Sequence, residues 1–245
     1  MSVYDNDRVL NIITVEYKSS HFLNERVNSI RALVRRPLNF ITIINSDESD
    51  TIYAIELGKN ESQEVYKLGN VGYSAGIQFG ASVAARRGLC DILVINPDCE
   101  ITSFSAVIFN RLKGGVMYFL DSNNQGVRQI NLLTSKTSEY SKYRKIFYTS
   151  YYDGPAFIIK DYSENLRIAS GNFMYFEELS WQSSFEQELL YDIAVKHQIG
   201  GSETLEVRKS IKASQIRGYL RFLRRKNILL LLFGVPVSLI RWLVK

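Results

Sequence analysis

A run of four aliphatic residues that stops at an Asn-Pro pair constrains this chain more than any other feature. The run, Ile92 to Ile95, stands in the segment DILVINPDCE, residues 91–100. A strand without polar alternation is typical of a sheet that is covered on both faces. Because proline has no N–H for the ladder, we expect the strand to end at Asn96-Pro97. The chain then delivers Asp98 to the end of a buried strand, where open α/β sheets bind ligands.

The rest of the chain alternates between strand-like and helix-like segments. Apolar residues make up 46% of the chain, which is ample for a core. We expect strands at 9–17, 38–44, 51–57, 91–95, 115–120 and 156–159, helices at 24–34, 72–87, 103–113 and 176–195, and a hairpin with a long loop within 121–150. This alternation predicts an α/β fold with a mostly parallel sheet flanked by helices.

Charge divides the chain into an acidic body, residues 1–206, and a basic tail, residues 207–245. The tail holds ten Lys or Arg and no acidic residue, whereas the body holds 20 basic and 25 acidic side chains. In the tail, apolar residues 216, 219, 220 and 223 alternate with Arg217, Arg221, Arg224 and Arg225. This pattern predicts basic amphipathic helices that bind an anionic membrane surface, although packing on the body or on a second subunit would also explain it.

Five short motifs occur in an order that resembles family 2 glycosyltransferases of the GT-A fold, in particular the bacterial rhamnosyltransferase-like branch. They are the polar turn from Asn45 to Asp50, the glycine segment NVGYSAGIQFG from Asn70 to Gly80, Asn96-Pro97-Asp98, Tyr175-Phe-Glu-Glu178, and His197 before Gly-Gly-Ser202. The resemblance covers about residues 9 to 205. It implies a GT-A, Rossmann-like domain at residues 1–206, with the basic tail following it.

The resemblance implies a divalent cation, Mg²⁺ or Mn²⁺, that neutralises the diphosphate of a nucleotide-sugar donor. Asp98 is the expected metal contact, and His197 would complete the metal site or contact the diphosphate. Taken alone, Asn96-Pro97-Asp98 is more often a simple turn, and a lone histidine is more often structural. Only the order of the motifs favours the functional interpretation.

The donor-binding residues implied by the resemblance are Asn45, Asn70, Gly72, Gly76, Gln78 and Asn96. Asn45 stands where the family has an aspartate that contacts uracil or thymine, and its side-chain carbonyl can still accept that hydrogen bond. Gln78 stands where the family often has asparagine. The alternatives are a turn or cap role for Asn45, and close helix–sheet packing for the glycine segment.

The Glu177-Glu178 pair is the candidate for acid–base chemistry, with Glu178 as the base and Glu177 in support. An acidic pair at a helix N-terminus is the alternative interpretation. The family often continues with an Asp and an Arg four residues apart, and this chain has Ser180 and Ser184 in those places. Because both charges are absent together, we expect a changed acceptor pocket rather than an unpaired charge.

We therefore expect an inverting glycosyltransferase at the inner, cytoplasmic face of the plasma membrane. By resemblance it would move a sugar, rhamnose favoured, from a dTDP- or UDP-sugar to a lipid-linked oligosaccharide acceptor in O-antigen or capsule synthesis. The alternative is a non-catalytic, membrane-associated scaffold that keeps the fold. A nucleic-acid partner is not expected, because the Leu-rich tail lacks the aromatic platforms on which bases stack.

Overall fold

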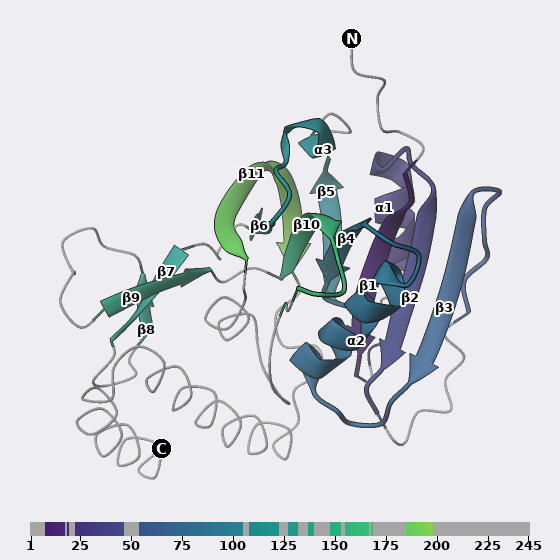
Figure 1. The fold of residues 1–245 in the computed structure, drawn as a ribbon, viewed down its shortest axis with the longest axis horizontal. Helices are drawn as coiled ribbons and strands as arrows, with labels where there is room; N and C mark the ends of the chain where they lie inside the picture. Colours follow the sequence, from purple (N-terminus) through teal and green to yellow (C-terminus); the bar gives the residue numbers. More distant parts are fainter. Residues whose placement is uncertain are drawn as a thin grey trace.

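The computed structural model of the chain is an α/β fold built on one eight-stranded sheet, with a separate three-stranded sheet (Figure 1). It describes residues 8–17, 19, 23–46, 54–104, 108–122, 127–131, 137–139, 148–152, 155–166, 168 and 185–197. The large sheet has the order β3-β2-β1-β4-β10-β6-β11-β5. Its strands are β1 (Leu10–Glu16), β2 (Leu38–Ile44), β3 (Glu61–Lys67), β4 (Cys90–Ile95), β5 (Cys99–Ser103), β6 (Val116–Ser122), β10 (Ala156–Tyr162) and β11 (Glu186–His197). The α/β class predicted from the alternation is confirmed.

Two helices cover opposite faces of the large sheet. Helix α1 (Leu23–Leu33) packs Val27 and Ile30 against Leu10 of β1, on the face that also holds Ile95. Helix α2 (Tyr73–Ala85) packs on the other face, over the side chains that alternate with these along each strand. All six residues of β4 are buried. The aliphatic run at 92–95 is therefore covered on both faces, as its composition predicts.

Strand direction makes the sheet mixed rather than mostly parallel. Strands β3, β2, β1 and β4 are mutually parallel, and β11 is parallel to β6. Strand β10 runs antiparallel to both β4 and β6, and β5 runs antiparallel to β11. The prediction of a mostly parallel sheet therefore holds for the β3-β2-β1-β4 half and is wrong for the other half. The carboxyl ends of β1, β2, β3, β4, β6 and β11 consequently share one edge, which we call the carboxyl edge.

The helix predicted over 176–195 is wrong within the described residues, because 186–195 belong to strand β11. Ile193 and Val195 are buried while Ala194 and Lys196 are exposed, which is the alternation of a strand. The pairing of β11 with β6 shifts register between Leu190 and Ala194. This irregularity interrupts the two-residue period, so the sequence loses its strand signature.

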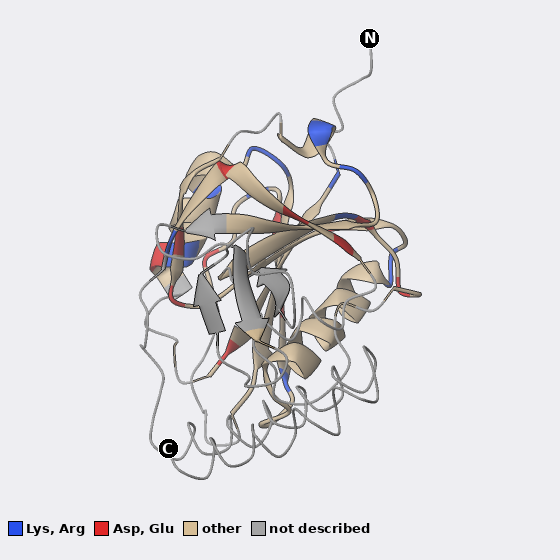
Figure 2. Cartoon of the chain, turned by 90° about the vertical axis from the view of Figure 1, so that its left-hand side faces the viewer, with Lys and Arg blue, Asp and Glu red and all other residues tan. Residues whose placement is uncertain are grey.

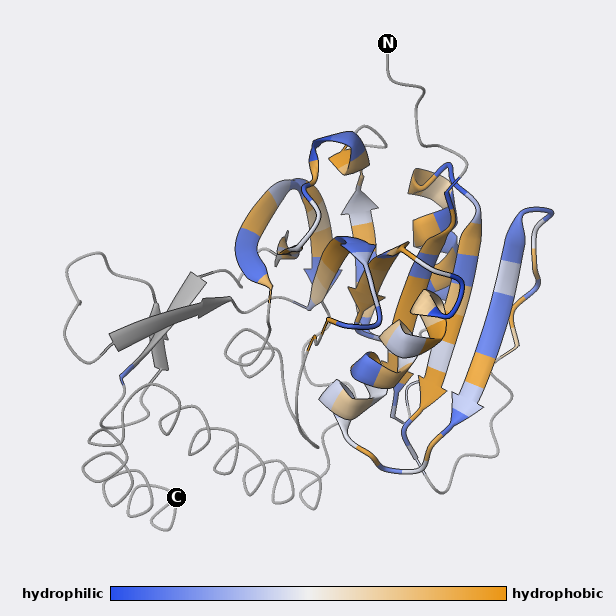
Figure 3. Cartoon of the chain, viewed as in Figure 1, coloured by the Kyte–Doolittle hydropathy of each residue, from blue (hydrophilic) through white to orange (hydrophobic). Residues whose placement is uncertain are grey.

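Two other predicted elements differ from the structure. Within the described part of the helix expected over 103–113, the helical residues are those of α3 (Ile108–Arg111), and residue 103 ends strand β5 (Cys99–Ser103). The strand expected over 51–57 is absent from its described part, 54–57, and the strand lies later, at β3. Strand β3, ESQEVYK, is hydrophilic and lies at the edge of the sheet (Figure 3). An edge strand packs on fewer neighbours, so it needs fewer apolar residues.

The segment expected to form a hairpin and a long loop contains the small antiparallel sheet, order β8-β7-β9. Its strands are β7 (Val127–Asn131), β8 (Thr137–Glu139) and β9 (Tyr148–Tyr152). Among the described residues, no helix is both long and apolar enough to cross a membrane. The predicted amphipathic tail, 207–245, lies outside the described residues.

Candidate functional site at the carboxyl edge

The strand order reverses at the carboxyl edge between β1 and β4. From β1 the chain adds β2 and β3 on one side, and then returns to place β4 on the other side. In open α/β sheets, the crevice outside the carboxyl ends at such a switch point is where ligands bind. The residues that follow Glu16, Ile44 and Ile95 therefore define the candidate site.

The Asn96-Pro97-Asp98 turn stands directly at this switch point. The backbone N–H of Asn96 donates to the Pro155 carbonyl at 3.0 Å, and the Asn96 carbonyl accepts the Cys99 N–H at 3.2 Å. Asp98 is partly exposed between these two anchored positions. The strand and its turn thus hold one carboxylate at the rim of the sheet, in the position that the sequence predicts.

The last residue of β11, His197, lies beside this turn through its backbone. His197 is the antiparallel partner of Cys99, the residue that follows Asp98. Directly opposed residues of an antiparallel pair have Cα atoms about 4.5–5.5 Å apart. The fold therefore brings together the backbones of the two predicted metal-site residues, although 98 positions separate Cys99 from His197 in sequence.

A divalent cation at this turn would have to be held in part by the substrate. Within the described part of the chain there is no group of three or more His, Cys, Asp or Glu side chains that could bind a metal by itself. Mg²⁺ commonly uses one or two carboxylates together with substrate phosphates rather than an all-protein cage. Asp98 is one carboxylate of this kind, and a cation at the turn stays a prediction.

Asn45, directly after β2, joins the carboxyl edge to the start of α2. Its side-chain Oδ1 accepts the backbone N–H of Gly72 at 3.0 Å, and its own N–H donates to the Glu16 carbonyl at 2.8 Å. Gly72 has φ 87°, a conformation that glycine adopts without strain. Asn45 is buried and holds Gly72, the residue before α2, although the helix itself has no side-chain cap hydrogen bond. The predicted contact with a base would use the second lone pair of the same oxygen.

Gly76 and Gly80 let α2 lie close to the sheet. A Cβ on Gly76 would stand 3.0 Å from both methyl groups of Val15, and one on Gly80 would stand 2.6 Å from Cγ2 of Ile13. Both glycines are therefore required for helix–sheet packing, which is the alternative weighed for the glycine segment. A nucleotide contact at Gly76 stays a prediction.

Gln78 connects α2 to the chain that follows β10. Its Nε2 donates to the Tyr162 hydroxyl at 3.1 Å, and its Oε1 accepts the Ile168 N–H at 2.9 Å. The Tyr162 hydroxyl in turn donates to the Leu166 carbonyl at 2.9 Å. Both ends of the amide are thus bonded inside the protein, and a donor-sugar contact at Gln78 stays a prediction.

The remaining predicted site residues are an exposed asparagine and the acidic pair. Asn70 is exposed two residues before Gly72. Glu177 and Glu178, together with Ser180 and Ser184, lie outside the described residues.

The sequence interpretation missed a buried ion pair beneath the Asn-Pro-Asp turn. Glu16, the last residue of β1, is fully buried, and its Oε1 lies 2.6 Å from Nη2 of Arg26 on α1. Ser19 donates its hydroxyl to Glu16 Oε2 at 2.7 Å, and Arg26 Nη1 donates to the Pro97 carbonyl at 3.2 Å. A charged residue closing the apolar run 9–15 is the signal that could have revealed this pair.

Tyr73, the first residue of α2, faces the same region. Burial raises the pKa of Tyr73 well above its usual value, and electrostatic interactions with Cys99 and Asp98 raise it further. The phenol is therefore held in its protonated form near Asp98. Helix α2 carries no charged residue and is tan along its whole length in Figure 2. The partial positive charge at its N-terminus thus has no compensating side chain on the helix itself.

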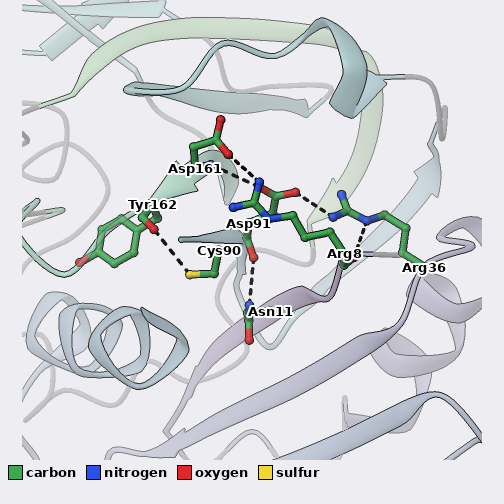
Figure 4. Close-up of polar contacts among 7 residues, drawn as sticks. All are labelled: Arg8, Asn11, Arg36, Cys90, Asp91, Asp161 and Tyr162. Atoms are coloured by element: carbon green, nitrogen blue, oxygen red, sulfur yellow. Dashed lines mark hydrogen bonds and ion pairs between the residues drawn. The ribbon is translucent and has the colours of Figure 1, made fainter. Parts of the chain in front are cut away.

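A second polar cluster lies at the opposite edge, around Asp91 at the start of β4 (Figure 4). Arg36 Nη2 lies 2.8 Å from Asp91 Oδ2, and Arg8 Nη1 lies 2.6 Å from Asp161 Oδ1. Asp161 interrupts β10 with φ 55°, beside a register shift. Two cations here face two anions, so the cluster compensates its own charge. We interpret it as a cluster that holds the amino ends of β1 and β4 together, at the edge opposite the carboxyl edge.

In comparisons with known proteins, the chain matches no protein-family model and no curated protein sequence. The assignment of function therefore depends on the ordered motifs and on the geometry of the carboxyl edge.

Proposed function

We propose that the chain is an inverting glycosyltransferase of the GT-A type. It moves a sugar, rhamnose favoured, from a dTDP- or UDP-sugar to a lipid-linked glycan acceptor in bacterial surface polysaccharide synthesis. The observation that carries the proposal is the Asn96-Pro97-Asp98 turn at the switch point, with His197 ending the strand beside it. An acidic side chain at that position suits a donor whose diphosphate binds together with a cation.

The proposed reaction is a single displacement at the anomeric carbon. The acceptor hydroxyl oxygen forms a bond to that carbon from the face opposite the diphosphate, while the bond from the carbon to the phosphate oxygen breaks. The nucleoside diphosphate leaves, and the hydroxyl proton passes to a carboxylate base. Glu178 is the predicted base, with Glu177 next to it. Mg²⁺ or Mn²⁺, when bound, supplies positive charge to the leaving diphosphate.

In this proposal, different residues of the chain bind different parts of the donor. Asp98 and His197 would hold the cation, with Asn96 beside them. Asn45 and the entry to α2 at Gly72 would face the nucleotide, with Asn70 at the rim, because a helix N-terminus favours anions and the first turn of this helix has no acidic side chain. The acidic pair would come from the far side of the sugar, as an inverting attack requires.

The proposed location is the cytoplasmic face of the plasma membrane, with the protein bound peripherally. The support is the ten basic residues and the absence of acidic ones in 207–245. Anionic lipid attracts such a segment by about 1 kcal/mol for each Lys or Arg near the surface. Binding to the membrane would bring the carboxyl edge close to a lipid-linked acceptor.

A non-catalytic scaffold is the second candidate. The observation that favours it is the Gln78 amide, which bonds Tyr162 and Ile168 inside the protein rather than standing open to a donor sugar. A scaffold with this fold would retain the helix entry and the packing glycines without turnover.

Release of nucleoside diphosphate from a panel of dTDP- and UDP-sugars, with Mn²⁺ present, tests the proposal. We expect release from at least one donor, and we expect Glu178→Gln to lower turnover more than donor affinity. Donor binding without any release, with or without a glycolipid acceptor, would favour the scaffold. No binding of any donor would contradict the glycosyltransferase proposal.

A further inference from the structure

The middle of the Asn-Pro-Asp turn is held by a side chain from α1. The Asn96 N–H and carbonyl are bonded to Pro155 and Cys99, which fixes the two ends of the turn. The carbonyl of Pro97, in the peptide unit that leads into Asp98, accepts a hydrogen bond from Arg26 Nη1. Rotation of that peptide would move the Asp98 carboxylate, so Arg26 restrains the direction in which Asp98 points.

Arg26 is in turn held by a fully buried carboxylate. Its Nη2 lies 2.6 Å from Glu16 Oε1, and the two side chains are 3% and 0% exposed. Ser19 Oγ donates to the second oxygen of Glu16 at 2.7 Å. The guanidinium fork thus spans two elements, with one amino group on β1 and the other on the turn after β4. A lysine, with a single ammonium group, does not present two donors in this fixed geometry.

Stability alone does not account for this pair. The desolvation of two buried charges offsets most of their mutual attraction, so well-packed apolar residues usually serve stability equally well. What an ion pair adds at such a place is a defined local conformation. A small hollow opens over it, lined by Glu25, Arg26, Pro97, Asp98, Cys99, Glu100 and Lys196. The pair therefore lies under the surface on which Asp98 is presented.

We propose that Arg26 is a positioning residue, which orients Asp98 through the Pro97 carbonyl and is itself oriented by Glu16. The inference rests on the proposed function, because it gives Asp98 a cation to contact. Groups that orient metal ligands typically contribute about 10- to 100-fold to metal affinity. Arg26 acts on the cation-dependent part of nucleotide binding and not on the part that is independent of metal.

Affinity of the full chain for UDP and for dTDP, measured with Mn²⁺ and with EDTA, tests this role. Arg26→Lys keeps a charge partner for Glu16 but cannot also reach Pro97. We expect the urea midpoint of this variant to stay near that of the wild type. We expect its Mn²⁺-dependent affinity to fall by about tenfold or more. The affinity measured in EDTA should not change.

Two further variants separate positioning from folding. Arg31→Lys is the matched control, because Arg31 lies on the same helix and pairs with Glu61, away from the turn; it should bind as the wild type does. The double variant Glu16→Gln/Arg26→Met removes both buried charges and keeps an acceptor for Ser19. We expect it to be folded and to lack the Mn²⁺ effect, even where Arg26→Lys fails to fold.

Three results would overturn the inference. A folded Arg26→Lys or double variant with wild-type Mn²⁺ dependence would show that Arg26 does not position Asp98. Equal losses in Mn²⁺ and in EDTA would show a general structural role. A wild-type chain without Mn²⁺-dependent nucleotide binding would remove the proposed function as well, and this result is distinguishable from the other two because it appears before any substitution.

Discussion

Asn45 Oδ1 accepts the backbone N–H of Gly72 at 3.0 Å, and this single bond fastens the end of β2 to the start of α2. The two residues are 27 positions apart and both are buried. The side chain that the sequence motifs predict to contact the nucleotide base therefore also holds β2 and α2 together. If the proposed function holds, a substitution of Asn45 would affect both donor binding and the entry to α2, so both should be measured.

Asn45→Ala should lower the free energy of unfolding by about 1–3 kcal/mol, because it leaves the buried Gly72 N–H without its acceptor. Asn45→Asp should retain stability, since a carboxylate accepts the same bond and is favoured at a helix N-terminus. Urea unfolding at neutral pH measures both. Asn70→Ala, at an exposed asparagine of the same segment, is the control and should change stability by less than about 0.5 kcal/mol. Equal stability of Asn45→Ala and Asn70→Ala would contradict the bond's importance.

Gly80→Ala should destabilise the protein by about 1–3 kcal/mol, because the added Cβ would stand 2.6 Å from Ile13 Cγ2. Gly76→Ala should cost less, since its nearest atoms, the Val15 methyl groups, are 3.0 Å away. In the double variant Ile13→Ala/Gly80→Ala the clash is absent, so its loss of stability should be smaller than the sum of the two single losses. Thermal unfolding followed by circular dichroism gives all four values. Additive losses would mean that α2 can move away from the sheet without cost.

Acid should weaken the attachment of β3 to α1. A hydrogen bond from Arg31 lowers the pKa of Glu61, with Arg31 Nε 2.9 Å from Glu61 Oε1. A carboxyl with a lowered pKa contributes stability above its ordinary pKa, and that contribution is lost as the pH falls through the lowered value. Glu61→Gln should therefore flatten the decline of the urea midpoint between about pH 5 and pH 2. A decline that is equally steep in Glu61→Gln and in the wild type would contradict the assignment.

The two thiols should be unreactive in the native protein. Burial raises the pKa of Cys90 to about 12 and raises the pKa of Cys99 further above its usual range. Because the thiolate is the reactive form, iodoacetamide at mildly alkaline pH should label neither residue natively and both in denaturant. Mass spectrometry of the labelled chain counts the adducts. Rapid native labelling of Cys99 would show that the turn beside it opens readily.

The strands that the sequence predicts well are those buried on both faces. The run at 92–95 is apolar throughout and the segment 38–44 is mostly apolar, and both lie between α1 and α2. Their apolar patterns can be recognised as strands without knowing which strands lie beside them. The turn after β4 could be predicted for the same reason, since Pro97 must end the ladder.

Strands β11 and β3 could not be predicted in this way. Leu189, Leu190 and Ile193 have helical spacing, yet pairing with β6 makes the segment a strand with a register shift. The hydrophilic β3 owes its state to its pairing with β2. Pairing with a neighbouring strand makes both segments strands, and the spacing of apolar residues along the chain does not indicate that pairing.

The same limit applies to the site. Asp98 and Asn45 stand in short motifs that predict their places after β4 and β2, whereas the proposed role of Arg26 depends on contacts with Glu16 and Pro97, the latter 71 positions away. Likewise, the packing role of Gly80 requires the position of Ile13 across the sheet. Short motifs locate the rim of the site, and the tertiary contacts show what supports it.

The central claim is that the Asp98 carboxylate contacts a cation on the diphosphate of a bound nucleotide. Calorimetric titration of the full chain with UDP and with dTDP, in Mn²⁺ and in EDTA, tests this claim most directly when the wild type is compared with Asp98→Asn. The account predicts tighter binding with Mn²⁺ for the wild type, and a folded Asp98→Asn variant that keeps its affinity in EDTA but gains nothing from Mn²⁺. An Asp98→Asn variant with the full Mn²⁺ gain, or a wild type with none, would contradict it.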